Sequence, residues 1–278
     1  MPHKLTRTHV ILFIATFFTT LIAGALLNGV IPWEEPEKIY RGLPFSLTLL
    51  LILMVHELSH YFTSRRHHVS ASLPYFIPAP PIIGTFGAII KMKPPIPDKR
   101  SLIDIGASGP IGGFIIAIIA CVIGLSLSEV KPAGALDGGL AFGSSLLFSF
   151  LSDLVLQTGP EEYDVMLHPV AFAGWLGLLV TSLNLLPIGQ LDGGHIVYAL
   201  FGEKHRLIAK ITIPILIVMG ITLWPGWIVW AILMLIMGYK HPPVVYPHIQ
   251  LDKNRKIIGW ISLAIFILTF TPMPVQGF

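Results

Sequence analysis

Residues 51–64 read LILMVHELSHYFTS, an apolar run that contains His56, Glu57 and His60. In a helix, residues four positions apart lie on one face, so His56 and His60 can direct two imidazoles at one point. Imidazole nitrogens are common ligands of a tetrahedral zinc ion. Glu57 would lie beside the metal rather than on it, where a carboxylate can take a proton from an attacking water. The stretch therefore predicts a zinc site with an adjacent base.

The composition predicts that this site lies in a membrane. The chain has 278 residues, is 54% hydrophobic and 12% charged, and has a mean hydropathy of +0.76, whereas a soluble domain is about 25% charged. Several apolar runs approach the roughly 20 residues that cross a hydrocarbon core of about 30 Å. A charged side chain within a span costs about 2.5–3.5 kcal/mol, which helix packing alone does not explain for Glu57. We therefore expect a multi-pass protein of the lipid bilayer in which Glu57 serves chemistry.

The predicted fold is an all-α polytopic membrane protein of about seven transmembrane helices with a small membrane-associated β-hairpin or sheet. We expect spans at 9–30, 43–64, 103–127, 170–188, 207–224, 227–239 and 257–273. They divide the chain into a first helix with its loop, a catalytic membrane core and a C-terminal group of helices, at 1–42, 43–200 and 201–278.

The distribution of basic residues predicts the orientation. Lys4 and Arg7 precede the first span, and the later clusters of lysine and arginine fall on the same side when seven helices are counted. By the positive-inside rule this side, which includes the N-terminus, is cytoplasmic. We expect the protein to be located in the cell membrane. Segment 138–156 is apolar enough to span, but counting it would invert every later loop. We expect it to be an external helix on the membrane surface.

A catalytic zinc ion usually has three protein ligands, so one ligand is missing from the histidine pair. Cys121 lies inside an apolar helix with no other site-like residue around it. Two similar sequences offer a carboxylate: ALDGGLAFG contains Asp137 and QLDGGHIVYA contains Asp192. In the predicted topology Asp192 lies at the depth of His56 and His60, whereas Asp137 lies on the opposite side. This favours Asp192 as the third ligand and an ordinary Asp-Gly turn at Asp137.

Residues 72–100 contain too many prolines for a regular helix. They predict a short strand within 82–93, paired in a hairpin with 74–79. We expect the free edge of this hairpin to pair with an unwound substrate strand, with Gly84, Thr85, Phe86 and Gly87 as substrate-binding residues. The alternative is an interfacial loop with no part in substrate binding.

The two motifs together resemble a known family. His56-Glu57-Leu-Ser-His60 followed by NLLPIGQLDG, which begins at Asn184, is similar to the paired signature of the site-2 proteases, which are intramembrane zinc metalloproteases. The wording of GTFGAI and NLLPIGQLDGGH looks most like the branch with archaeal, bacterial and chloroplast members. The resemblance implies one zinc ion per chain, held by His56, His60 and Asp192, with Glu57 as the catalytic base. It also implies that Asn184 contacts the substrate or the developing oxyanion.

The expected function is hydrolysis of a peptide bond in or near a transmembrane segment, toward the cytoplasmic side. The substrate would be a single-pass or polytopic membrane protein, as in regulated intramembrane proteolysis. The alternative is a divalent-metal transporter, but its polar groups would gather at the midplane. His195, three residues after Asp192, is either a packing residue, a support for the metal ligands or an oxyanion contact. Nucleic acid is not an expected partner, and the oligomeric state stays open.

Overall fold

The computed structural model describes residues 5–93, 95–132, 134, 141–157, 163–238 and 241–276, which are mainly helical. Its α-helices are α1 (Arg7–Leu27), α2 (Leu43–Arg66), α3 (Lys99–Ser126), α4 (Leu146–Leu156), α5 (Pro169–Asn184), α6 (Asp192–Phe201), α7 (His205–Thr222), α8 (Gly226–Met237) and α9 (Lys253–Thr269). The 3-10 helices η1 (Pro36–Gly42) and η2 (Gly202–Lys204) precede α2 and α7. The strands are β1 (Tyr75–Pro78), β2 (Thr85–Ile89), β3 (Glu129–Pro132), β4 (Ala141–Phe142), β5 (Tyr163–Met166) and β6 (Val275–Gln276).

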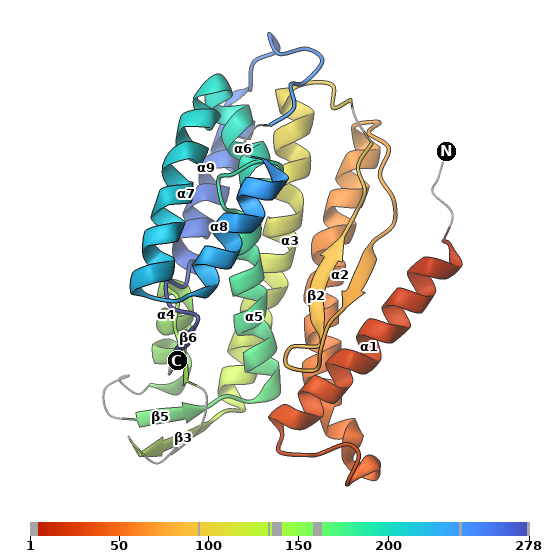
Figure 1. Ribbon diagram of the computed structural model, residues 1–278, viewed down its shortest axis with the longest axis vertical. Coiled ribbons are helices and arrows are strands. Elements are labelled where there is room, and N and C mark those ends of the chain that lie inside the picture. Colours follow the sequence, from red (N-terminus) through yellow and green to blue (C-terminus); the bar gives the residue numbers. More distant parts are fainter. Residues whose placement is uncertain are drawn as a thin grey trace.

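The long helices form an upright bundle in which successive members run in opposite directions (Figure 1). α3 lies at its centre and packs against α2, α5, α6 and α9. The connection 241–252 and the short helix α6 lie at the upper end of the view, where α2 finishes, whereas the hairpin of β1 and β2 runs down from that end alongside α2. The motif-bearing ends of α2 and α6 are therefore brought to one end of the bundle.

Four described segments are long and apolar enough to cross a membrane: Arg7–Leu27, Pro36–Arg66, Lys99–Ser126 and Asp192–Thr222. Shorter apolar helices occupy Leu146–Leu156, Pro169–Asn184 and Gly226–Ile236. A helical protein with several candidate membrane helices is thus confirmed, whereas the predicted count of seven spans is not.

The predicted span 170–188 shows why the count differs. α5 has 16 residues, which gives about 24 Å at 1.5 Å per residue and is short for a hydrocarbon core. The helix ends at Asn184 because Pro187 lacks a backbone N–H and Gly189 adopts a positive φ of 58°. The apolar sequence continues past this break, so hydropathy alone overestimates the length of the helix.

A helix was expected within 138–156, and the structure has α4 there, with 11 residues. This gives about 16 Å, too short for a crossing. The expected place of α4 on the external side stays a prediction. α4 packs on α3 and α9 and buries Phe148 and Leu151. Residues 138–140 of the predicted segment lie outside the described residues.

The predicted hairpin is confirmed. β1 and β2 pair antiparallel, with Tyr75 opposite Ile89 and Phe76 opposite Ala88. The hairpin lies against α1 and α2, with β1 on the side of α1 (Figure 1). At its turn Gly84 has a φ of 85°, and the Thr19 hydroxyl of α1 donates to its carbonyl at 2.6 Å. A Cβ at Gly84 would meet the α1 backbone at 2.5 Å, so only glycine allows this approach. Two further strand pairs, β3 with β5 and β4 with β6, lie outside the site.

Candidate active site

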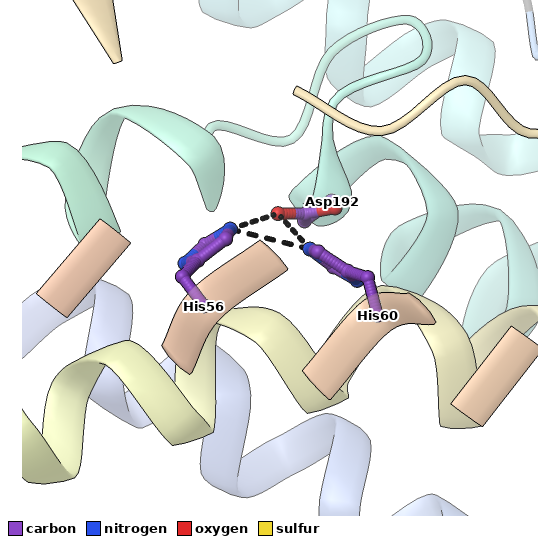
Figure 2. Close-up of side chains that lie close together, drawn as sticks. All are labelled: His56, His60 and Asp192. Carbon is purple, nitrogen blue, oxygen red and sulfur yellow. Dashed lines mark hydrogen bonds and ion pairs between the residues drawn. The ribbon is translucent and has the colours of Figure 1, made fainter. Parts of the chain in front are cut away.

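Three side chains from two helices converge at one point (Figure 2). His56 and His60 lie one turn apart on α2, and Asp192 opens α6. Nε2 of His60 lies 3.2 Å from Nε2 of His56 and 3.2 Å from Oδ2 of Asp192. Nε2 of His56 lies 3.4 Å from the same carboxylate oxygen. The two histidines chosen by helical spacing and the aspartate chosen by its predicted depth therefore lie in one cluster.

The spacing of these three atoms fits a zinc ion. A tetrahedral ion with bonds of 2.0–2.1 Å separates its ligand atoms by about 3.3–3.4 Å, since the edge of a tetrahedron is about 1.6 times the bond length. The observed separations are 3.2, 3.2 and 3.4 Å. His60 Nδ1 lies 2.7 Å from the Ile105 carbonyl, to which it donates, so that Nε2 keeps its lone pair for the metal. The three residues therefore form a group that could hold a metal ion, and their spacing fits zinc.

Asp192 reaches this position because the chain turns back sharply before α6. A Cβ on Gly193 would lie 2.0 Å from the Leu185 carbonyl oxygen, and one on Gly194 would lie 2.3 Å from that of Gly189. Both glycines of the Asp-Gly-Gly sequence therefore let α6 start directly against the turn that follows α5.

Glycines of α3 make room for the side chains of the two histidines. These glycines were not identified from the sequence alone. A Cβ on Gly109 would lie 2.0 Å from Nε2 of His60, and one on Gly113 would lie 3.1 Å from Nδ1 of His56. The run GASGPIGG at 106–113 was the available signal, because small residues at this spacing allow close helix packing in membranes.

Glu57 and Asn184 line the same cavity as the three ligands. Glu57 is buried, and the backbone of Ile90 lies within hydrogen-bonding reach of its carboxylate. Asn184 Nδ2 lies 3.3 Å from Nε2 of His56. A carboxylate and an amide donor thus flank the cluster, as general-base chemistry beside a polarised carbonyl requires.

The part of the hairpin that lines the cavity lies beyond the four residues that were predicted to bind substrate. Residues 88–92 line the cavity. Gly84, Thr85, Phe86 and Gly87 lie toward the turn and are not among the described lining residues. The Thr85 hydroxyl donates to the Ile77 carbonyl at 2.9 Å, and the Phe86 side chain is 75% exposed. The substrate role of these four residues stays a prediction.

Two further histidines, His195 and His241, line the cavity. His241 comes from the segment between α8 and α9, far from either motif, and no pattern in the sequence pointed to it. Asp137, the alternative ligand, lies outside the described residues.

Comparison with known proteins agrees with this geometry. The family model named Peptidase family M50 matches residues 44–224, which include both motifs. The chain belongs to this family. The resemblance to the site-2 proteases is thus confirmed, and with it a family of zinc-dependent proteases.

Two plant relatives are named as probable zinc metalloproteases. "Probable zinc metalloprotease EGY1, chloroplastic" of Arabidopsis thaliana is 31% identical over 256 residues, which cover 88% of this chain and 46% of that protein. The rice protein of the same name, from Oryza sativa subsp. japonica, is 32% identical over 238 residues, 84% of this chain and 41% of that protein. The chain therefore spans less than half the length of these relatives. No solved structure matches the chain significantly.

Proposed function

We propose that this chain is an intramembrane zinc metalloendopeptidase that hydrolyses a peptide bond in or near a transmembrane segment of a membrane-protein substrate. The observation that carries the proposal is the set of three ligand atoms at tetrahedral zinc spacing beside Glu57, within a bundle of apolar helices. Membership in a peptidase family supports it. The transporter alternative receives no such support.

The residues divide the chemistry between them. Zinc bound by His56, His60 and Asp192 would supply a Lewis acid for the scissile carbonyl and for water. Glu57 takes the proton of the attacking water and passes it to the leaving amine. Asn184 directs its amide N–H groups toward the oxygen on which negative charge develops. Burial of these groups strengthens their electrostatic effect because water screens them poorly there.

We further propose that the upper end of the bundle in Figure 1 is cytoplasmic and that cleavage occurs toward that side of the cell membrane. The C-terminal end of α2 and the N-terminal ends of α3 and α9 lie at this end. They carry the basic residues Arg65, Arg66, Lys99, Arg100, Lys253, Arg255 and Lys256. The positive-inside rule assigns such an end to the cytoplasm.

The free edge of β2 is the proposed docking site for an unwound substrate. The backbone of Lys91 is paired through its carbonyl with the Ser72 N–H, at 3.0 Å, and Lys93 N–H donates to the Ser70 carbonyl at 2.8 Å. Backbone groups of successive residues in an extended strand point to opposite edges. Those of Ile90 and Met92 therefore point away from β1, toward the cavity that both residues line. An added strand there would lie alongside Glu57.

Replacing Ala88 with proline tests this docking edge. By the same alternation the Ala88 N–H faces the free edge, and proline removes that donor while edge positions tolerate its ring. We expect Ala88→Pro to lower the rate of substrate cleavage roughly tenfold with zinc content unchanged. Ala88→Ser, which keeps the N–H, serves as the matched control. Equal cleavage by Ala88→Pro and wild type would remove β2 as the docking strand.

Metal content of Asp192→Ala tests the proposed function itself. Wild-type protein in detergent should carry about one zinc ion per chain. Asp192→Ala should lose most of that zinc because two histidines alone leave the ion without its third ligand. Asp137→Ala should keep it. A wild-type protein without bound zinc would contradict the protease proposal, and equal loss in both variants would contradict the choice of ligand.

A further inference from the structure

His195 and His241 form a buried pair at the edge of the cavity. His195 lies on α6 one turn after Asp192, and His241 lies between α8 and α9. Nδ1 of His195 is 2.6 Å from Nε2 of His241. Both side chains are buried, and both line the cavity that contains the zinc-binding group. The pair therefore connects the C-terminal part of the chain to the site.

The hydrogen bonds around His241 determine which of its ring nitrogens carries the proton. Nδ1 lies 2.5 Å from the Pro242 carbonyl, which can only accept, so Nδ1 is the donor. Burial, and after it the nearby His195, lowers the pKa of His241 to about 3, which keeps its ring neutral. Nε2 of a neutral ring with a proton on Nδ1 is an acceptor. His195 must then donate from Nδ1, which leaves the lone pair on its own Nε2.

His241 is itself held in place by its surroundings. Its backbone N–H donates to Nε2 of His205 at 3.2 Å, and Nδ1 of His205 donates to the Gly202 carbonyl at 2.8 Å. Its ring stacks on Tyr198, with the ring centroids 4.5 Å apart. These contacts give His241 one orientation rather than a set of rotamers.

The segment that carries His241 is also tied to the chain that follows the hairpin. Val245 N–H donates to the Ile96 carbonyl at 3.1 Å, and Tyr246 N–H donates to the Pro97 carbonyl at 2.8 Å. Ile96 lines the same cavity. The chain that continues from β2 and the segment that carries His241 are thus hydrogen-bonded to each other, and both line the cavity.

His195 Nε2 has no hydrogen-bond partner in the described part of the chain, although its ring lines the cavity. A lone pair cannot stabilise a developing oxyanion, which needs a donor. It can accept from an N–H, and a polypeptide in the cavity presents backbone N–H groups along its length. The tautomer therefore disfavours the oxyanion role considered for His195 from the sequence.

We propose that His195 Nε2 accepts a hydrogen bond from a backbone N–H of the substrate, and that His241 is the positioning residue that keeps His195 in this acceptor form. The inference rests on the proposed protease function. It gives the segment between α8 and α9, which the matched family region at 44–224 does not include, a part in substrate binding.

Paired substitutions at His241 test the inference. His241→Phe keeps an aromatic ring on Tyr198 but removes the acceptor, whereas His241→Gln can offer its amide oxygen to His195. The probe is the peptide that wild type cleaves fastest in a panel of synthetic single-span peptides. We expect His241→Phe to raise KM roughly 3- to 10-fold, the effect of one hydrogen bond, with kcat and zinc content little changed. His241→Gln should restore KM.

Ester-substituted peptides identify the donor. In wild type, replacing one backbone N–H near the cleavage site by an ester oxygen should raise KM by a similar factor, and the same ester should have no further effect in His195→Phe. Unchanged KM in His241→Phe and His195→Phe would overturn the inference while leaving the protease intact. A loss in His241→Phe that His241→Gln does not restore would also overturn it, as a structural effect. Failure of wild type to cleave any peptide in the panel would instead count against the proposed function.

Discussion

Glu57→Gln should abolish cleavage while leaving zinc bound. Glutamine has nearly the shape of glutamate, so the cavity and the ligand cluster are preserved, but its amide cannot take a proton from water. General-base catalysis contributes about 10²- to 10⁴-fold to a rate, and here the same group also delivers the proton to the leaving amine. We therefore expect a fall in kcat of about a thousandfold or more. The measurements are peptide cleavage and zinc content of the purified protein.

Glu203→Gln is the matched control for this change. Glu203 lies in η2, with its side chain 71% exposed and within 3.0 Å of Arg206, and it is outside the cavity lining. The same chemical change there should leave cleavage and zinc content at wild-type levels, because a surface ion pair contributes little. Wild-type cleavage by Glu57→Gln would show that another group is the base.

Much of the zinc site could be predicted because its parts are set by local rules. A separation of four positions in a helix is enough to place His56 and His60 on one face. The choice of Asp192 as the third ligand needed a second step. The positive-inside rule gave a topology, and this topology placed Asp192, but not Asp137, at the depth of the histidines. The structure brings Asp192 to both histidines. Asn184 is observed beside His56, although its catalytic role stays a proposal.

His241 could not be predicted because nothing local determines its position. Its ring accepts from His195 of α6, and its backbone N–H donates to His205 at the start of α7. Such contacts depend on how α7, α8 and α9 pack, and hydropathy patterns carry no information on side-chain pairing between helices. The lining residues 88–92 were missed for a related reason. A hairpin was predictable from its prolines and glycines, but its register against α2 was not.

Gly109→Ala should remove zinc from the site. Alanine normally stabilises a helix relative to glycine by about 1 kcal/mol. Here the added methyl would lie 2.0 Å from Nε2 of His60, the proposed zinc-ligand atom. The ring cannot retreat freely, since its Nδ1 is held by the Ile105 carbonyl at 2.7 Å. Loss of a supporting contact to a ligand costs about 10- to 100-fold in metal affinity. Displacing the ligand atom itself should cost at least about 100-fold, with cleavage lost in parallel.

Gly112→Ala separates this effect from a general disturbance of α3. Its methyl would meet the Ser59 hydroxyl at 2.5 Å, but that oxygen ends a short side chain that can rotate away from its bond to the Val55 carbonyl. We therefore expect Gly112→Ala to keep zinc and most of its cleavage rate, since the methyl displaces a hydroxyl and not a ligand. The two variants add the same group to the same helix three residues apart. Equal zinc affinity in Gly109→Ala and wild type would show that α3 does not determine the position of His60.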